Sequence, residues 1–237
     1  MTPLLTGQAS EDGKGVSLAA SGGGVTSRSR SWDGALRLLP VPTAVDLDAA
    51  SEAAREFLTA LGVRLDSQCL LATPDRMTHA YAEMLTPRPF EVTTFPNDEG
   101  YDELVVARSI PLQSVCEHHI LPFVGVAHLG YIPGERVIGL SKLARVVEHF
   151  ARRPQVQERL TTQIADWLQA TLAPRGVGVV LEAEHLCMTM RGVRSTGAST
   201  LTSAVRGQLR EDARSRAEFF ALANQRSSRP VDGDCRD

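Results

Sequence analysis

The chain has 237 residues, a hydrophobic share of 43% and a formal net charge of −3 at pH 7, values typical of a globular protein with a real core. The mildly acidic balance gives no electrostatic case for nucleic acid as a partner, and no apolar run approaches the length needed to span a bilayer. With four scattered cysteines and no signal peptide, we expect a cytoplasmic protein without a membrane partner.

Both ends of the chain have the composition of disordered segments. Residues 1–44 are rich in Gly, Ser and Thr and contain too little apolar surface to offset the entropy lost on ordering. We expect the same of the tail, 223–237. Between these segments we predict an N-terminal helical region over 45–98 and a larger domain over 99–222.

Two helices are predicted in the N-terminal region. The first begins after Asp46, keeps its apolar residues on one face, and ends at Gly62, a residue suited to a C-cap. The second begins with Thr73 as the N-cap and Pro74 at the first helical position. The connection over 89–98 is expected to be irregular.

The larger domain mixes strands and helices. Residues 104–110 and 176–191 have the composition of strands, and 123–132 alternates as a half-buried antiparallel strand should. A helical period marks residues 139–150, and Pro154 opens the next helix. This mixture predicts the α+β class.

Three potential metal ligands occur in two short clusters. Cys116 and His119 have the C-x2-H spacing with which a turn can offer a thiolate and an imidazole to zinc, and Cys187 offers a second thiolate later in the chain. Three protein ligands favour a catalytic metal, which keeps its fourth position for water. The competing interpretation is that these are structural cysteines in the core.

Two further histidines stand beside these ligands. His118 is next to His119, and His185 precedes Cys187 by two residues. On a strand over 176–191, a period of two places His185, Cys187 and Arg191 on one side. A metal ligand, a candidate acid or base and a guanidinium would then share a surface.

A basic group at the start of the helix over 139–150 suggests phosphate chemistry. Ser141 is a natural N-cap, and the free amides and dipole at that end favour an anion. Lys142 and Arg145 are neighbours on the helix surface, and with Arg191 they would suit a polyphosphate. The alternative is a solvated basic helix face.

Gln157 and Glu158 begin the helix that follows Pro154. A carboxylate that faces the N1 and 2-amino donors of guanine is chemically apt. Both residues are equally suited to the surface of a first helical turn, where acidic groups complement the helix dipole.

Four motifs together resemble the GTP cyclohydrolase I family. They are residues 114–119 (SVCEHH), 139–145 (GLSKLAR), 153–160 (RPQVQERL) and 185–192 (HLCMTMRG). The resemblance runs in the family's order and spacing from about residue 46 to 222, and it leaves both ends of the chain outside.

The resemblance implies a role for each motif residue. The implied zinc ligands are Cys116, His119 and Cys187, and the implied catalytic residues are His118 and His185. The residues that it assigns to GTP are Gln157 and Glu158 for guanine, and Ser141, Lys142, Arg145 and Arg191 for the ribose and triphosphate. Arg76 is assigned to the triphosphate of a neighbouring subunit.

The implied reaction converts GTP and water to 7,8-dihydroneopterin triphosphate and formate, the first step of pterin and tetrahydrofolate biosynthesis. His185 would protonate N7 of guanine, and His118 would assist opening of the ribose. The implied fold is the tunnelling fold, an antiparallel sheet with paired helices on one face, whose subunits join into a β-barrel within a homodecamer. A homologue without turnover, or the same reaction in a specialised deazapurine or pterin pathway, remains open.

Overall fold

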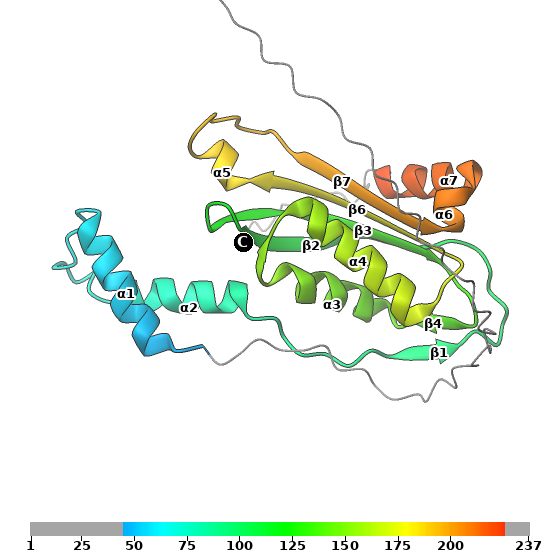
Figure 1. Cartoon of the computed structure of the whole chain (residues 1–237), viewed down its shortest axis with the longest axis horizontal. Coiled ribbons are helices and arrows are strands. Elements are labelled where there is room, and N and C mark those ends of the chain that lie inside the picture. The colour runs from blue at the N-terminus through cyan, green and yellow to red at the C-terminus, as the bar shows by residue number, and fades with distance from the viewer. Residues whose placement is uncertain (1–44, 226–237) are drawn as a thin grey trace, which may run out of the picture. The chain divides into compact units, whose positions relative to one another are not determined.

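The computed structural model describes residues 45–225 (Figure 1). The expected disorder of 1–44 and of most of the tail falls on residues outside this range. The last helix extends to Asn224, two residues into the segment for which we expected disorder. Within the described residues, no helix is long and apolar enough to cross a membrane.

The N-terminal region forms the two predicted helices, α1 (Leu47–Ala60) and α2 (Thr73–Leu85). The Asp46 side chain caps α1 by accepting from the Ala49 amide at 2.9 Å. Gly62 follows the end of α1 at φ +81°, a left-handed conformation that glycine adopts without strain. The prediction that Thr73 is an N-cap is wrong: Ala72 holds that position, because a preceding turn already satisfies the Thr73 amide.

A five-stranded sheet forms the larger domain and confirms the α+β class. Its order is β5-β2-β3-β6-β7, and every pairing is antiparallel except that of β2 with β5. The strands are β2 (Val105–Cys116), β3 (Leu121–Ile132), β5 (Pro154–Gln155), β6 (Gly176–His185) and β7 (Thr200–Gly207). The connection over 89–98 is partly regular, since β1 (Thr94–Pro96) pairs with β4 (Arg136–Ile138).

Two helices, α3 (Leu140–Ala151) and α4 (Gln157–Leu172), pack on one face of the sheet (Figure 1). Their buried aliphatic residues join those of alternate sheet positions in one core, which includes Leu143, Leu160, Leu129 and Val179. This period-two arrangement is the ordinary consequence of strand geometry. It places the first turn of α4 beside the ends of β2 and β6.

Two short helices, α6 (Gln208–Glu211) and α7 (Ala213–Asn224), belong to a second apolar cluster that includes Val180 and Phe219. The Phe219 ring lies where the side chains of Gly130 and Gly178 would be, since a Cβ at these positions would come within 2.7 and 2.5 Å of it. Neither glycine can be replaced without moving this ring.

Four element boundaries differ from the predictions. The strand expected over 104–110 continues to Cys116 as β2. The strand expected over 176–191 ends at His185, because its pairing with β3 ends there and the chain turns into α5 (Leu186–Thr189). Pro154 lies in β5, paired with Val115, so α4 begins only at Gln157. Gly139, whose carbonyl accepts from the Lys142 amide, is the N-cap of α3, and Ser141 lies inside the first turn.

Candidate active site

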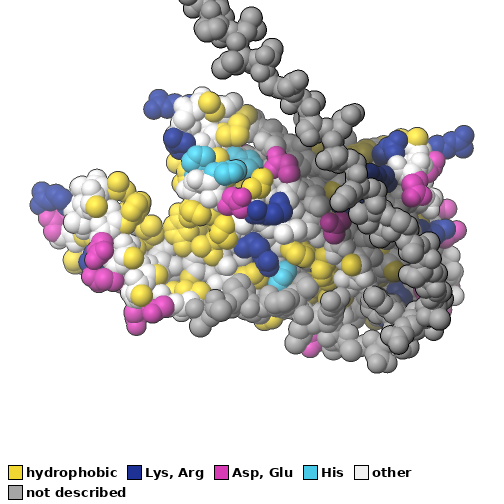
Figure 2. Space-filling model, viewed as in Figure 1, with side chains coloured by type: hydrophobic (Ala, Val, Ile, Leu, Met, Phe, Trp, Pro, Cys, Tyr) yellow, Lys and Arg dark blue, Asp and Glu magenta, His cyan; other side chains and the backbone are white. Residues whose placement is uncertain are grey.

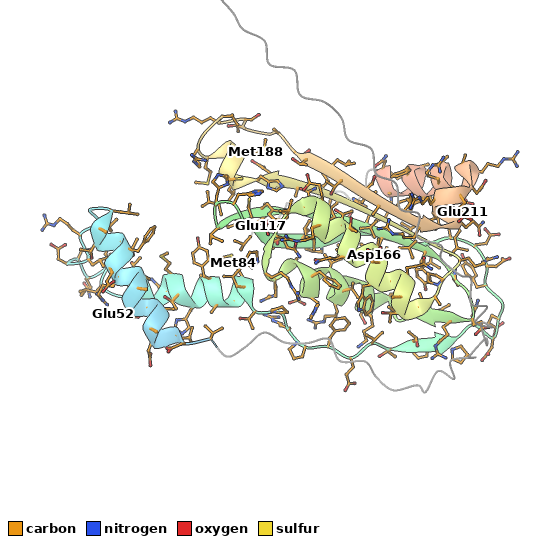
Figure 3. The ribbon with its side chains drawn as sticks, in the orientation of Figure 1. Glu52, Met84, Glu117, Asp166, Met188 and Glu211 are labelled. Carbon is orange, nitrogen blue, oxygen red and sulfur yellow. The ribbon has the colours of Figure 1, made fainter. Side chains whose placement is uncertain are left out.

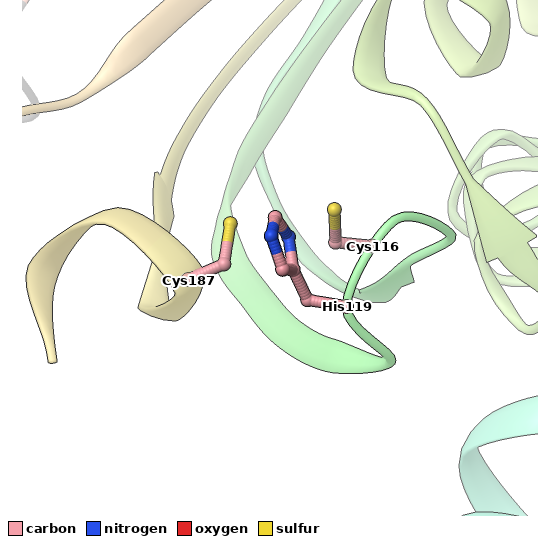
Figure 4. Close-up of side chains that lie close together, drawn as sticks. All are labelled: Cys116, His119 and Cys187. Carbon is pink, nitrogen blue, oxygen red and sulfur yellow. The ribbon is translucent and has the colours of Figure 1, made fainter. Parts of the chain in front are cut away.

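Cys116, His119 and Cys187 meet at one end of the sheet, where their potential ligand atoms all lie within 4.8 Å of one another. The imidazole lies between the two sulfur atoms in Figure 4. Two thiols and an imidazole are a donor set that suits zinc. The residues therefore fit a zinc ion, with one position left for water or substrate.

The turn after β2 supplies two of these three groups. Cys116 is the last residue of β2 and is 5% exposed, and its carbonyl accepts from the amides of His119 and Ile120. Ile120 has φ +52°, a strained conformation for a β-branched residue. The turn bends sharply enough to bring the His119 ring back over Cys116.

Cys187 comes from α5, and the sheet determines where α5 begins. His185 pairs with Phe123 of β3 at the end of β6, and β3 itself starts just after the turn that carries His119. Burial raises the pKa of the Cys187 thiol, with the neighbouring Cys116 as the second cause. Without a metal the Cys187 thiol therefore resists losing its proton, whereas a bound cation would favour the thiolate.

His185 is held by contacts on two sides. Its Nε2 lies 2.7 Å from Oε1 of Gln157, and its ring stacks on Phe123 with 4.5 Å between centroids and 11° between planes. Burial lowers the pKa of His185, and the charge of Glu158 opposes that shift. Burial thus favours the neutral ring, and the nearby carboxylate favours its protonated form.

These groups line one cavity of about 320 Å³, together with His118 and Glu158. Histidine side chains gather at the surface of this end of the sheet in Figure 2, beside acidic ones. The Glu158 side chain is exposed, and among residues 45–225 none forms an ion pair with it within 4.0 Å. Its carboxylate remains available for a ligand. Nδ1 of His118 lies 3.7 Å from the Cys116 sulfur.

Glu117 and Arg159 connect the turn after β2 with helix α4. The two side chains form an ion pair, and Arg159 also donates to Oε1 of Gln155 at 3.1 Å and to the Pro154 carbonyl at 3.2 Å. The hydrogen bond that Arg159 donates to the Glu117 carboxylate is the main reason that the pKa of Glu117 is lowered. Glu117 and Met188 of α5 lie at the same end of the sheet in Figure 3.

The residues expected to bind triphosphate are not in this cavity. Ser141, Lys142 and Arg145 lie on α3, whose other end, at Ala151, accepts a hydrogen bond from Ser114 near the cavity. At 1.5 Å per residue, Lys142 is about 13 Å along the helix from that end. Arg145 is paired with Glu148 of its own helix at 2.9 Å.

The two remaining arginines also lie outside the cavity lining. Arg76 of α2 donates to the Cys69 carbonyl and to Thr73 Oγ1. Arg191, just after α5, is exposed, and its positive charge favours the Cys187 thiolate. One chain therefore brings together the potential metal ligands, the histidines and the Glu158 carboxylate, whereas the lysine and arginines expected to bind triphosphate lie outside the cavity lining.

Sequence reasoning missed three residues that shape the site. Phe123 stacks on His185, Arg159 holds Glu117, and Thr202 of β7 contacts the Gln157 amide at 3.1 Å. Phe123 and Thr202 have the ordinary alternation of strand residues, so no local signal marks them. Only Arg159 carried a signal, since it belongs to the 153–160 motif.

A potential metal site, a half-buried histidine and an available carboxylate in one cavity of an α+β fold are the groups of a metal-assisted acid–base enzyme. The family model described as GTP cyclohydrolase I matches residues 50–224. The chain belongs to the GTP cyclohydrolase I family.

Three relatives that are more than 50% identical support this assignment. A protein of Thermobifida fusca named GTP cyclohydrolase 1 is 53% identical over 186 residues, which cover 76% of this chain and 90% of that protein. Proteins of the same name from Mycobacteroides abscessus and Mycolicibacterium gilvum are 55% and 57% identical, covering 77% and 75% of this chain and 92% and 90% of theirs. A crystal structure of the archaeosine synthase QueF-Like is similar over 44% of this chain and 93% of its own, at a TM-score of 0.37 and 19% identity.

Proposed function

We propose that this protein is a zinc-dependent GTP cyclohydrolase I, which converts GTP and water to 7,8-dihydroneopterin triphosphate and formate. The observation that carries the proposal is the convergence of Cys116, His119 and Cys187 in the cavity that also holds His185 and Glu158. Family membership supplies the reaction, and the geometry supplies the groups that it requires.

Cys116, His119 and Cys187 would hold the zinc ion in this proposal. When bound, zinc supplies Lewis-acid activation of water at neutral pH. The buried position of Cys116 and the partial burial of Cys187 limit the access of bulk water to the thiolates. His119, which is exposed, is the ligand nearest to the solvent.

The protein's own side chains would bind the base and move the protons. Glu158 accepts hydrogen bonds from N1–H and the 2-amino group of guanine, a pair of donors that adenine lacks on that edge. His185 delivers a proton to N7 of the base, since it lies in the same cavity as Glu158, whose charge favours the protonated imidazole. His118 assists opening of the ribose.

A second part of the proposal is that the site is shared between subunits. Ser141, Lys142, Arg145 and Arg191 would bind the triphosphate, and Arg76 would reach the site of a neighbour. The basic residues of α3 lie outside the cavity of their own chain, which supports a contribution in trans. β7 ends the described sheet without a partner on its outer side, an edge that another subunit could extend into a β-barrel of a homodecamer.

The experiment that tests the function uses purified full-length protein loaded with zinc. Incubation with GTP should release formate and yield a product that becomes a fluorescent pterin after oxidation. ATP should yield neither, because it lacks the two donors that Glu158 accepts. A zinc-loaded protein that binds GTP without releasing formate would instead be a homologue without turnover.

A further inference from the structure

Gln157 is a polar side chain of the cavity lining that is almost completely enclosed. It begins α4, where polar residues commonly face water, yet it is 2% exposed. Its Nε2 lies 2.9 Å from the Thr200 carbonyl, 3.2 Å from the Leu181 carbonyl and 3.1 Å from Thr202 Oγ1. Burial of an amide is costly unless such partners satisfy it.

These partners determine which way the amide points. The carbonyls of Leu181 and Thr200 can only accept hydrogen bonds, so the group that faces them must be the NH₂ end of Gln157. The Oε1 end then faces His185, and since Oε1 only accepts, His185 Nε2 must be the donor across their 2.7 Å contact. A neutral His185 therefore carries its proton on Nε2.

Two threonines reinforce this orientation. Thr161 Oγ1 lies 2.7 Å from the Gln157 carbonyl and 2.7 Å from Thr202 Oγ1. Thr161 donates to the Gln157 backbone carbonyl, and Thr202 donates to Thr161. The two Nε2 hydrogens of Gln157 then serve three acceptors, Thr202 Oγ1 and the two carbonyls, so one hydrogen is shared. The reverse amide orientation would place Oε1 against two carbonyls and leave its NH₂ end unable to accept from His185 Nε2–H.

We propose that Gln157 is a positioning residue, which fixes the orientation and the Nε2–H tautomer of His185, and that its side chain does not contact guanine. Phe123 sets the plane of the imidazole by stacking, and Gln157 sets its rotation within that plane. Nδ1 is left as the nitrogen that exchanges a proton with a bound substrate: it donates from the doubly protonated imidazolium, and His185 then returns to the neutral Nε2–H form. The proposal rests on the proposed function only in giving His185 a catalytic role.

The tautomer is measured without substrate or turnover. Zinc-loaded wild-type protein labelled with ¹⁵N-histidine, with His185→Gln to identify the signal, should show a neutral His185 with a protonated Nε2 in solid-state NMR spectra. A neutral His185 protonated on Nδ1 would overturn the proposal whether or not the protein turns over GTP. This result is independent of the proposed activity.

A pair of near-isosteric variants separates positioning from space filling. Gln157→Met keeps the volume and removes every side-chain hydrogen bond, whereas Gln157→Glu keeps an acceptor for His185 Nε2. A space-filling role favours Met, because a buried carboxyl group is the more costly of the two. Positioning favours Glu, so kcat should fall in the order wild type, Gln157→Glu, Gln157→Met, with a loss of about 100-fold for Met.

The matched control is Gln169→Met, the same change on the same helix, where the amide donates to the Pro174 carbonyl at 3.3 Å. Its kcat should equal that of the wild type. Gln157→Met should bind GTP as the wild type does, because the positioning role leaves the guanine contacts intact. If instead it weakens GTP binding and keeps its kcat, Gln157 contacts the base and the proposal is wrong.

Two outcomes distinguish this proposal from the function on which it rests. If wild-type protein releases no formate, the proposed function fails, and the tautomer measurement alone decides the role of Gln157. If the wild type is active and Gln157→Met does not fold, as shown by loss of zinc and of a cooperative thermal transition, the wild-type tautomer and the kcat of Gln157→Glu decide it.

Discussion

The cavity end of the sheet and the basic surface of α3 differ in how many of their functional side chains have partners within one chain. At the cavity end, ligands from the β2–β3 turn and from α5 come within 4.8 Å, and His185 has a fixed partner at 2.7 Å. On α3, Ser141 and Arg145 are exposed, and among residues 45–225 the ion-pair partner of Arg145 is Glu148 of the same helix.

This difference suggests that the reactive groups and the triphosphate-binding groups of one site come from different subunits. Groups that do chemistry must be held within a few tenths of an ångström, so one folded chain provides them with its own hydrogen-bonded supports. Groups that bind a flexible triphosphate tolerate more freedom, and a second subunit can supply them. The following predictions test that division.

The largest effect is expected at the metal ligands. Cys187→Ala should lose zinc and formate release together, by more than the roughly 100-fold that removal of a ligand's hydrogen-bond partner costs. Cys69→Ala, which removes an exposed cysteine, is the matched control and should keep both. Metal analysis of the purified proteins and a formate assay measure the two quantities. Full activity in metal-free Cys187→Ala would contradict the role of zinc.

The next prediction addresses the division directly. Arg145→Ala and His185→Ala should each be nearly inactive alone. Mixed in equal amounts after dissociation and reassembly, they should recover roughly a quarter of wild-type activity, one half times one half, if each site takes these residues from two different chains. If subunits exchange and no activity returns, each chain builds a complete site, and the proposal that α3 serves the cavity of another subunit is wrong.

Much of the cavity end could be predicted from sequence because its signals are local. The C-x2-H spacing placed Cys116 and His119 on one turn, and they converge there. Cys187 converges with them although its predicted strand is wrong. The pairing of β6 with β3 delivers α5 to the turn, and this tertiary contact has no local signal.

The role of Gln157 could not be predicted for a similar reason. A glutamine in the first turn of a helix commonly faces water, and its burial here depends on carbonyls from β6 and β7 that are distant in sequence. On α3, phosphate binding by Lys142 and Arg145 stays a prediction, because no spacing in the sequence indicates which cavity, or which subunit's cavity, these residues serve.

A smaller effect is expected where the turn is tied to α4. Arg159→Leu removes the ion pair with Glu117 and the hydrogen bond to Gln155, so the turn that presents His119 loses its support. Zinc affinity should fall by about 10-fold, the lower end for loss of a ligand's supporting partner. Arg206→Leu, which breaks the ion pair with Asp166, is the control. Competition with a chromophoric chelator measures both. An unchanged zinc affinity in Arg159→Leu would show that the turn holds its shape alone.

The smallest effect concerns the buried side of α3, where we expect stability and not catalysis to depend on pH. His149 is 3% exposed, its Nε2 accepts from Arg153 at 3.1 Å, and burial, followed by the charge of Arg153, lowers its pKa to about 4. The folded state therefore binds fewer protons than the unfolded state between pH 6.5 and 4, so the free energy of unfolding must fall as the pH falls through that range. Between pH 7.5 and 5.5 the loss should be about 1 kcal/mol. Urea unfolding of wild type and His149→Leu at both pH values isolates this contribution, because the variant lacks the titrating group whatever its stability at pH 7.5. An equal pH dependence in the two proteins would mean that His149 is not the group responsible.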